Sequence, residues 1–301
     1  MPNEIDPALR QTITGILPPI TTPFDEDGAL VFEAIAEQVE FIIAAEATGI
    51  IAGGSTGEGH TLGSEVFAAV MSEAHRAIAG RVPFVAGLIV NSTQEAIERV
   101  RLLDDLTVDA LQVTPVHYLF RPDDDATVEH FRAIWQATGI PLLIYNVIPW
   151  NYLGVDLMLR IMDEVPGVIG IKQSSGDLKS LSDLLLRVKP ENLVLTGIDA
   201  LLYPAFTLGA HGAITALTSA VPGTVVKLWR LVEAGDHSAA RELHYKLNAL
   251  WNVLRHDNLP AFTKYIQHRQ GLGFYHPRAP MEGISDADRE QVDKALAALL
   301  S

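Results

Sequence analysis

The sequence predicts an α/β fold, a (β/α)8 barrel of the TIM type with a C-terminal helical extension. Short apolar runs rich in β-branched residues alternate with longer amphipathic stretches over most of the chain. The short runs are almost continuously apolar, as in parallel strands covered on both faces. Eight such strand–helix units suit a barrel of roughly 250 residues. An open doubly wound sheet is the alternative, although no G-x-G-x-x-G motif follows any predicted strand.

The predicted strands share an apolar body and an end in small, polar or turn-forming residues. They are Ile16–Thr21, Gly49–Gly54, Pro83–Ile89, Ala110–Thr114, Pro141–Val147, Val168–Gln173, Leu193–Ile198 and Gly212–Ala216. The stretches between them have apolar residues at helical spacing. Helices are therefore predicted at Val31–Ala47, Ser64–Ala79, Thr93–Asp105, Ala126–Thr138, Asp156–Glu164, Asp177–Val188 and Asp199–Leu208.

Acidic residues 123–125 are expected to begin a helix, because carboxylates cap and complement a helix N-terminus; a metal site is the alternative there. From Pro222 onward the chain is predicted to be helical, with more helix than one barrel unit needs. We therefore expect residues 1–222 to form the barrel and residues 223–301 to supply its last helix and an appendage. These helices are Thr224–Glu233, Ser238–His256, Pro260–Gln270 and Ser285–Leu300.

Composition and charge narrow the class of protein. The 301 residues are 48% hydrophobic and carry a net charge of -15, with no basic stripe of the kind that binds nucleic acid. There are no cysteines, so disulfides and thiolate chemistry are excluded. Met1–Arg10 is polar, and no apolar run reaches the roughly 18 residues of a membrane helix. The prediction is a cytoplasmic protein without nucleic-acid or membrane partners.

Lys172 is the most informative residue of the sequence. It lies within the apolar sixth strand, whereas the other six lysines have helix-like or loop surroundings. A lysine is rarely buried without a partner, because removing an ammonium group from water costs several kcal/mol. Burial favours the neutral amine, which can form a Schiff base with a ketone. The alternative is a side chain whose amine reaches solvent at the strand end.

Two other strand ends offer complementary chemistry. The second strand runs into Gly53–Glu58, where three glycines and two hydroxyls could hold a small carboxylate with backbone N–H groups. The fifth strand ends in Tyr145, whose phenol could move protons. The alternatives are an ordinary strand-to-helix turn and a core tyrosine. Together with Lys172 these groups fit one mechanism, in which an amine attacks a 2-keto acid.

The same positions resemble the dihydrodipicolinate synthase / N-acetylneuraminate lyase family of class I pyruvate-type aldolases. The resemblance runs from about Ile16 to Met281. It is carried by Gly54-Ser55-Thr56-Gly57-Glu58, Tyr145-Asn146, Gly170-Ile171-Lys172-Gln173-Ser174-Ser175-Gly176-Asp177 and Gly209-Ala210-His211-Gly212-Ala213-Ile214, with Pro18 to Pro23, Asn258-Leu259-Pro260 and Lys264.

The resemblance implies a Schiff-base-forming lyase that acts on pyruvate or another 2-keto acid and needs no cofactor. It makes Lys172 the Schiff-base lysine, Tyr145 the general acid/base and Ser55 its link to a hydroxyl relay. Thr56 would bind the keto-acid carboxylate, and Ile214 would place its carbonyl near the imine. It also implies a homotetramer, a dimer of dimers. Gly54, Ser174 and Asp199 complete the expected substrate-binding residues.

The sequence departs from both branches of the family. The synthase branch has an Arg after Tyr-Asn that binds aspartate semialdehyde, but residues 147–154 here contain none. Its relay tyrosines follow Thr-Pro, where this chain offers Tyr118 or His117. The lyase branch holds the sugar tail with an Asp-Glu pair, of which only Asp199 is present. These differences favour a sugar-derived or otherwise neutral keto acid over aspartate semialdehyde.

Three functions therefore stay open at this point. The first is the Schiff-base lyase, and the second is a 4-hydroxy-tetrahydrodipicolinate synthase that condenses pyruvate with aspartate semialdehyde. The third is a non-catalytic keto-acid binding protein on the same barrel. The altered loops are expected to bring Tyr118, Phe120, Ile148 and Trp150 near the mouth of the site, or into a subunit contact. The histidines show no H-E-x-x-H motif, so no metal site is predicted.

Overall fold

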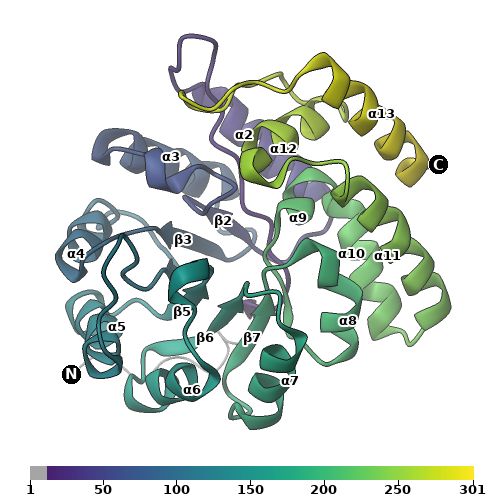
Figure 1. Cartoon of the computed structure of the whole chain (residues 1–301). Helices are drawn as coiled ribbons and strands as arrows, with labels where there is room; N and C mark the ends of the chain where they lie inside the picture. The colour runs from purple at the N-terminus through teal and green to yellow at the C-terminus, as the bar shows by residue number, and fades with distance from the viewer. Residues whose placement is uncertain (1–11) are drawn as a thin grey trace.

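Eight parallel strands curl around the centre of the molecule, and helices surround them (Figure 1). The structure is a computed structural model that describes residues 12–301. The polar N-terminal stretch, Met1–Arg10, lies outside the described residues, as does our expectation about it. No helix within the described part is long and apolar enough to cross a membrane.

The strands lie at the predicted positions, and most are shorter than the predicted ranges. The order in the sheet is β1-β8-β7-β6-β5-β4-β3-β2, and every pairing is parallel. A bridge between Pro19 and Ile51 joins the two ends of this order, which confirms the barrel against the open sheet. The strands are β1 (Gly15–Ile16), β2 (Ile50–Ala52), β3 (Phe84–Leu88), β4 (Ala110–Val113), β5 (Leu142–Asn146), β6 (Val168–Gln173), β7 (Leu193–Thr196) and β8 (Gly212–Ala213).

The helices of the barrel lie between the strands, as predicted. Asp123 accepts a hydrogen bond from the Ala126 N–H at 2.8 Å, which confirms that the acidic run begins a helix. The helices are α2 (Phe32–Ala44), α3 (Ser64–Ile78), α4 (Thr93–Arg101), α5 (Asp124–Thr138), α6 (Val155–Glu164), α7 (Leu178–Arg187) and α8 (Leu202–Thr207). Single 3-10 turns occur at η1 (Gly59–Thr61), η2 (Pro149–Asn151) and η3 (Asp199–Leu201).

The C-terminal helices differ from the prediction in two places. A short helix, α9 (Ala216–Ala220), begins at Thr215, whose side chain forms a reciprocal capping box with Thr218. The predicted helix to His256 ends at Trp251 instead, and a 3-10 turn, η4 (His256–Asn258), precedes the next helix. The others are α10 (Pro222–Glu233), α11 (His237–Trp251), α12 (Leu259–His268) and α13 (Asp286–Leu300).

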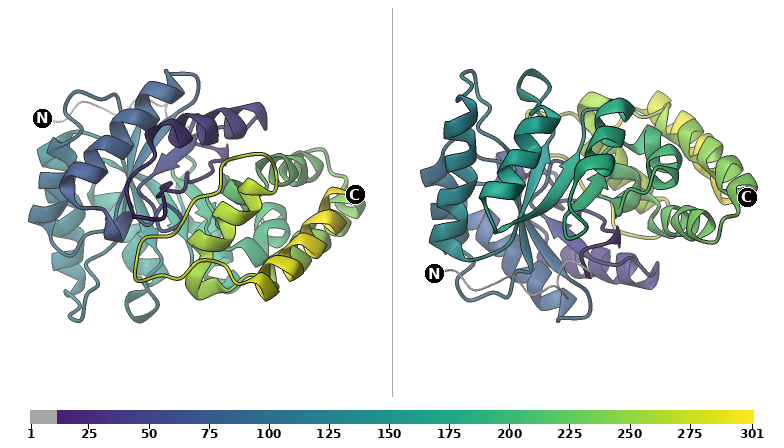
Figure 2. Two further views of the ribbon diagram at one scale, coloured as in Figure 1. Left: turned by 90° about the horizontal axis from the view of Figure 1, so that it is seen from above. Right: turned by 90° about the horizontal axis from the view of Figure 1, so that it is seen from below.

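Helices α10 to α13 gather on one side of the barrel (Figure 2), and they share an apolar core with residues of β1, α8, β8 and α9. A buried ion pair links this group to the barrel: Lys264 Nζ on α12 donates to Glu58 Oε1 at 2.5 Å. The ammonium also donates to the His276 carbonyl at 2.6 Å, and the Arg278 N–H donates to the other Glu58 oxygen at 2.7 Å. Burial lowers the pKa of Lys264, an effect that the carboxylate of Glu58 opposes.

The strand register brings the centre of the site together. Val168 pairs with Leu142, but Gly170 pairs with Leu143, so β6 carries one extra residue between these two pairs. Such a bulge changes which face the following side chains point to. Gly170 fits this irregular stretch because a Cβ there would lie 2.5 Å from the Leu193 carbonyl oxygen.

We expect Lys264→Met to lower the free energy of unfolding by about 3–5 kcal/mol, because it leaves the Glu58 carboxylate buried without its cation. Urea unfolding followed by circular dichroism measures the change. Lys179→Met is the matched control, since it breaks an exposed pair with Asp183 and should move the midpoint little. Equal midpoints for the two variants would show that the buried pair does not hold the fold.

Candidate active site

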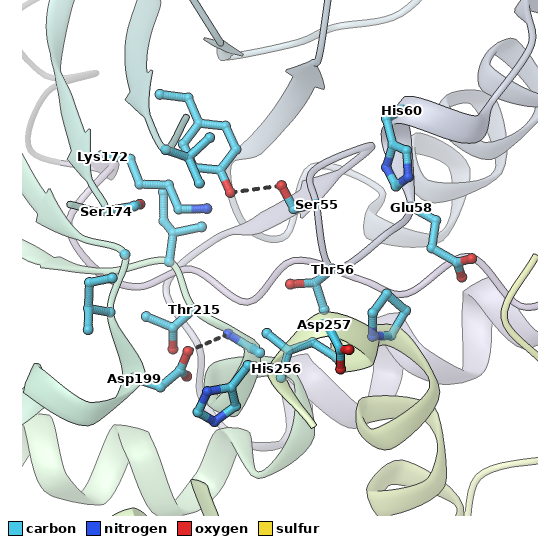
Figure 3. Close-up of a pocket in the computed structure, with 18 of the residues that line it drawn as sticks. Ser55, Thr56, Glu58, His60, Lys172, Ser174, Asp199, Thr215, His256 and Asp257 are labelled. Atoms are coloured by element: carbon cyan, nitrogen blue, oxygen red, sulfur yellow. Dashed lines mark hydrogen bonds between the residues drawn. The ribbon is translucent and has the colours of Figure 1, made fainter. Parts of the chain in front are cut away.

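A cavity of about 400 Å³ opens at the carboxyl ends of the strands, where barrel enzymes bind their substrates (Figure 3). Its inner wall comes from strand ends, and its outer wall comes from the C-terminal helices. The lining residues that enter the argument are Ser55, Thr56, Glu58, His60, Tyr145, Tyr152, Lys172, Ser174, Gly197, Asp199, Ile214, Thr215, Trp251, His256, Asp257, Leu259, Pro260 and Met281.

Lys172 is buried, as the sequence predicts, and its side chain reaches into the cavity. Ile169 packs among the interior side chains of the barrel, whereas Ile171 packs outward against the helices. Because of the bulge in β6, both Ile169 and Lys172 face the inside although three positions separate them. The register then places Lys172 directly beside Tyr145 on the neighbouring strand.

The phenol of Tyr145 connects the amine to the glycine-rich loop. Lys172 Nζ lies 3.8 Å from the centroid of the Tyr145 ring, a cation–π distance when the amine is protonated. The Tyr145 hydroxyl and Ser55 Oγ are 3.0 Å apart and share a hydrogen bond (Figure 3). A hydroxyl chain therefore leads from the surroundings of the amine toward the loop after β2.

Gly197 makes room for the two polar side chains of β6 that line the cavity. A Cβ at this position would lie 1.9 Å from Ser174 Oγ and 3.1 Å from Lys172 Cε. Ser174 Oγ is buried and has no hydrogen-bond partner among residues 12–301, so its donor remains available to a ligand. Gly197 stands near the end of the predicted strand Leu193–Ile198, but the sequence does not show that Ser174 and Lys172 need the space beside it.

The loop after β2 is folded by its own backbone. The Gly59 N–H donates to the Gly54 carbonyl at 3.0 Å, and a Cβ on Gly59 would lie 1.8 Å from the Gly53 oxygen. Gly54 itself does not line the cavity, but Ser55 and Thr56 do. The loop therefore presents two hydroxyls to the cavity and keeps its glycines for close backbone contacts.

Ile214 and Asp199 also line the cavity, but the carboxylate of Asp199 is engaged elsewhere. It accepts hydrogen bonds from the Leu217 N–H at 2.6 Å and the Ala216 N–H at 3.4 Å, at the start of α9. Burial raises the pKa of Asp199, and the hydrogen bonds from Thr215 and these amides oppose that shift. The geometry thus makes Asp199 an anchor for α9, with little capacity left for a ligand.

Tyr118, Phe120, Ile148 and Trp150 are not among the residues that line the cavity, and their expected place near its mouth stays a prediction. The side chains of Tyr118 and Phe120 are 72% and 80% exposed because the loop after β4 runs outward. Trp150 covers that loop by donating from Nε1 to the His117 carbonyl at 2.7 Å. The subunit-contact alternative therefore stays a prediction for these aromatic residues, and the relay role of Tyr118 has no support within one chain.

Two polar side chains of the motifs, Asn146 and Gln173, hold the strand ends together. Asn146 is buried and closes the loop after β5, since its amide donates to the Leu153 carbonyl and accepts from the Leu153 N–H. It also donates to Gln173 at 3.0 Å, and Gln173 in turn donates to Ser180. This chain of amides fixes the ends of β5 and β6, from which Tyr145 and Lys172 project.

The outer wall contains residues that the sequence did not reveal as part of the site. His60 comes from η1, Trp251 is the last residue of α11, and His256 and Asp257 come from η4, between α11 and α12. Their only signal was closeness in sequence to Glu58 and to the Asn258-Leu259-Pro260 motif. Residues 12–301 contain no group of three or more His, Asp or Glu side chains placed to hold a metal ion.

Comparisons with known proteins agree with this geometry. The profile of the Dihydrodipicolinate synthetase family matches residues 12–299. A 4-hydroxy-tetrahydrodipicolinate synthase from Laribacter hongkongensis is 35% identical over 289 residues, covering 95% of this chain and 98% of the relative.

Two solved structures extend the comparison. A prophage protein of the dihydrodipicolinic acid synthase family from E. coli K12, in complex with pyruvate, has a TM-score of 0.90 at 25% identity, covering 96% of this chain and 99% of that chain. The wild-type sialic acid aldolase of Ruminococcus gnavus has a TM-score of 0.89 at 25% identity, covering 96% of this chain and 97% of that chain.

A (β/α)8 barrel that holds a buried lysine beside a tyrosine at its strand ends is an enzyme of the Schiff-base, class I aldolase type. The chain belongs to the dihydrodipicolinate synthetase family, and it is a class I aldolase- or lyase-type enzyme.

We expect Tyr145→Phe to keep the cavity and the fold but to lose about a hundred- to ten-thousand-fold in turnover, the range for a positioned acid/base. Steady-state kinetics on a cleavable 2-keto acid measure this loss. Ser55→Ala is the companion variant, and its loss should be smaller because it removes only the hydroxyl next to the phenol. Turnover of Tyr145→Phe within about threefold of wild type would show that the phenol only packs.

Proposed function

We propose that the chain cleaves, forms or dehydrates a 2-keto acid through an imine on Lys172, with a sugar-derived keto acid as the preferred substrate. The observation that carries this proposal is the Lys172 amine, buried in the cavity with its Nζ against the Tyr145 ring. A buried amine lowers the stability of the fold. A role as nucleophile gives a reason for such an amine to be kept there.

The residues divide the steps of the reaction. Lys172 Nζ attacks the ketone carbon, and the resulting carbinolamine loses water to form the imine. Tyr145 takes a proton from the C4 hydroxyl while the C3–C4 bond breaks, which releases an aldehyde and leaves an enamine. Protonation at C3 and hydrolysis then return pyruvate and the free amine. In a dehydratase the C3–C4 bond is kept: the imine instead loses a proton from C3 to give an enamine, which expels the C4 hydroxyl as water with a proton supplied by the phenol.

The other wall groups hold the acid end of the substrate. Thr56, through its hydroxyl and N–H, binds the carboxylate of the keto acid, and the unpaired Ser174 hydroxyl is available to a substrate oxygen next to the imine. Ile214 contributes its carbonyl near the amine. No metal or organic cofactor takes part in this proposal.

The main alternative is condensation of pyruvate with aspartate semialdehyde, the activity in the name of the Laribacter hongkongensis relative. Against it, the cavity lining contains no Arg that could bind a second carboxylate. A bidentate Arg is a common partner of a substrate carboxylate. A site without such an Arg discriminates poorly in favour of substrates that carry a second carboxylate. The non-catalytic binding protein is the second alternative, and it gives no reason for a buried amine.

We expect aspartate semialdehyde to be a poor co-substrate, with kcat/KM well below the roughly 10⁴ M⁻¹s⁻¹ at which ordinary enzymes begin. A coupled condensation assay with pyruvate measures this, beside a cleavage assay on sugar-derived and arylidene keto acids. Efficient condensation would overturn the substrate proposal and would indicate that Arg121 on the loop after β4 reaches the site.

The Schiff base itself is tested by borohydride trapping with pyruvate, followed by mass spectrometry. We expect one stable adduct on Lys172 in the wild type and none in Lys172→Ala. That variant should lose several orders of magnitude in turnover, yet its stability should hold or rise, because an uncompensated buried amine is removed. Retention of more than a few per cent of activity would contradict the role of Lys172.

Two further features belong to the proposal. The exposed apolar residues Tyr118, Leu119, Phe120 and Trp150 would be covered by a second copy of the chain in a homotetramer built as a dimer of dimers. Sedimentation equilibrium measures that assembly, and a monomer at micromolar concentration would contradict it.

A cytoplasmic location also stays a prediction, which fractionation of the source cells would check.

A further inference from the structure

The inner half of the cavity accounts for the acid end of a keto acid but not for its tail. Lys172, Tyr145 and Thr56 surround the position of the ketone and its carboxylate under the proposed function. The outer half is formed by Trp251, the last residue of α11, and by the segment between α11 and α12, which carries His256 and Asp257. In Figure 3, His256 and Asp257 lie on the side of the cavity away from Lys172.

We propose that Asp257 and His256 form a distal subsite that binds neighbouring hydroxyl groups on an uncharged substrate tail. This inference rests on the proposed function, because the tail is delivered by a keto acid bound at Lys172. It assigns the recognition of the tail to the C-terminal segment and not to the end of β7.

The availability of the acidic groups supports this assignment. Three carboxylates line the cavity. Glu58 is buried and bound to Lys264 and the Arg278 N–H. The carboxylate of Asp199 accepts hydrogen bonds from the N–H groups at the start of α9. Asp257 is 76% exposed and accepts from Arg255 only at 3.3 Å for each oxygen. A carboxylate has about four acceptor positions, so Asp257 can accept hydroxyl hydrogens as well.

His256 is held in a fixed orientation that leaves one ring nitrogen free. Its ring stacks on Trp251, with centroids 4.1 Å apart and planes inclined by 21°. Nε2 lies 3.1 Å from the Trp251 carbonyl, which can only accept, so Nε2 carries the hydrogen. In the neutral ring Nδ1 is then an acceptor. A pair of acceptors from consecutive residues suits two neighbouring hydroxyl donors.

The segment that carries both residues is anchored. Asn258 is buried and donates to the Glu282 backbone carbonyl at 2.8 Å. Lys264, two turns further along α12, is fixed by the Glu58 ion pair. Pre-organised groups lose little entropy when a ligand binds.

The chemistry of the subsite selects against a charged tail. The Asp257 carboxylate would repel a second carboxylate, and like charges in contact cost several kcal/mol at an interface. Leu259, Pro260 and Met281 line the same side and can pack against the C–H faces of a polyol chain. The expected ligand is therefore a 2-keto acid with a neutral vicinal-diol tail.

Borohydride trapping at Lys172 tests this with two keto acids that differ only in the tail. The probes are 2-keto-3-deoxygluconate, which has hydroxyls at C5 and C6, and 4-hydroxy-2-oxohexanoate, which has none there. We expect the wild-type enzyme to reach half-maximal trapping at a concentration at least tenfold lower for the hydroxylated probe. Asp257→Ala and His256→Ala should each remove most of that preference and leave trapping by pyruvate within twofold of wild type.

Glu282→Ala is the matched control. It removes a carboxylate that shares the Arg255 guanidinium with Asp257, but Glu282 does not line the cavity, so the preference should remain. Equal trapping of the two probes by wild type, or an equal loss of preference in Glu282→Ala, would overturn the subsite. Failure of pyruvate to trap on Lys172 would instead overturn the proposed function, so the two failures are distinguishable.

Discussion

The buried ion pair between Glu58 and Lys264 joins the loop after β2 to helix α12, which also packs against the barrel through a shared apolar core. Glu58 ends the loop that presents Ser55 and Thr56, and it has a left-handed backbone conformation with φ of 56°. Lys264 lies in α12, the helix that directly follows the segment carrying His256 and Asp257. Because an unpaired buried charge is so costly, neither partner can leave without the other. The pair therefore fixes the spacing between the inner and outer walls of the cavity.

Sequence reasoning recovered the barrel because each of its layers leaves a periodic signal. Parallel strands buried on both faces appear as short apolar runs, and the helices outside them show helical spacing. The family motifs also located the inner wall, since Tyr145 and Lys172 lie on the neighbouring strands β5 and β6 and Ser55 follows the end of β2. A lysine in an apolar strand is informative on its own, because few structural roles place one there.

The rest of the site depends on contacts between residues far apart in the chain. Lys264 sits on an ordinary amphipathic helix, and only its distance from Glu58 shows that it is buried. Asp199 was expected to bind substrate from the resemblance to the lyase branch, but its carboxylate accepts hydrogen bonds at the start of α9, a helix that the sequence did not predict. The end of α11 at Trp251 likewise could not be foreseen, and it is this end that turns His256 and Asp257 toward the cavity.

The inner wall of the cavity is held by the strands of the barrel, whereas the outer wall is held by the segment between α11 and α12. This difference explains how one family can act on several substrates. Moving Lys172 requires changes in the β6 bulge and at Gly170 and Gly197, because a Cβ on Gly170 would lie 2.5 Å from the Leu193 carbonyl oxygen and one on Gly197 would lie 1.9 Å from Ser174 Oγ. Replacing His256 or Asp257 requires none of these, because both lie in a short turn whose anchors are Asn258 and Lys264. Imine chemistry is therefore tied to the barrel, whereas tail recognition can vary in the C-terminal segment without disturbing the reacting groups.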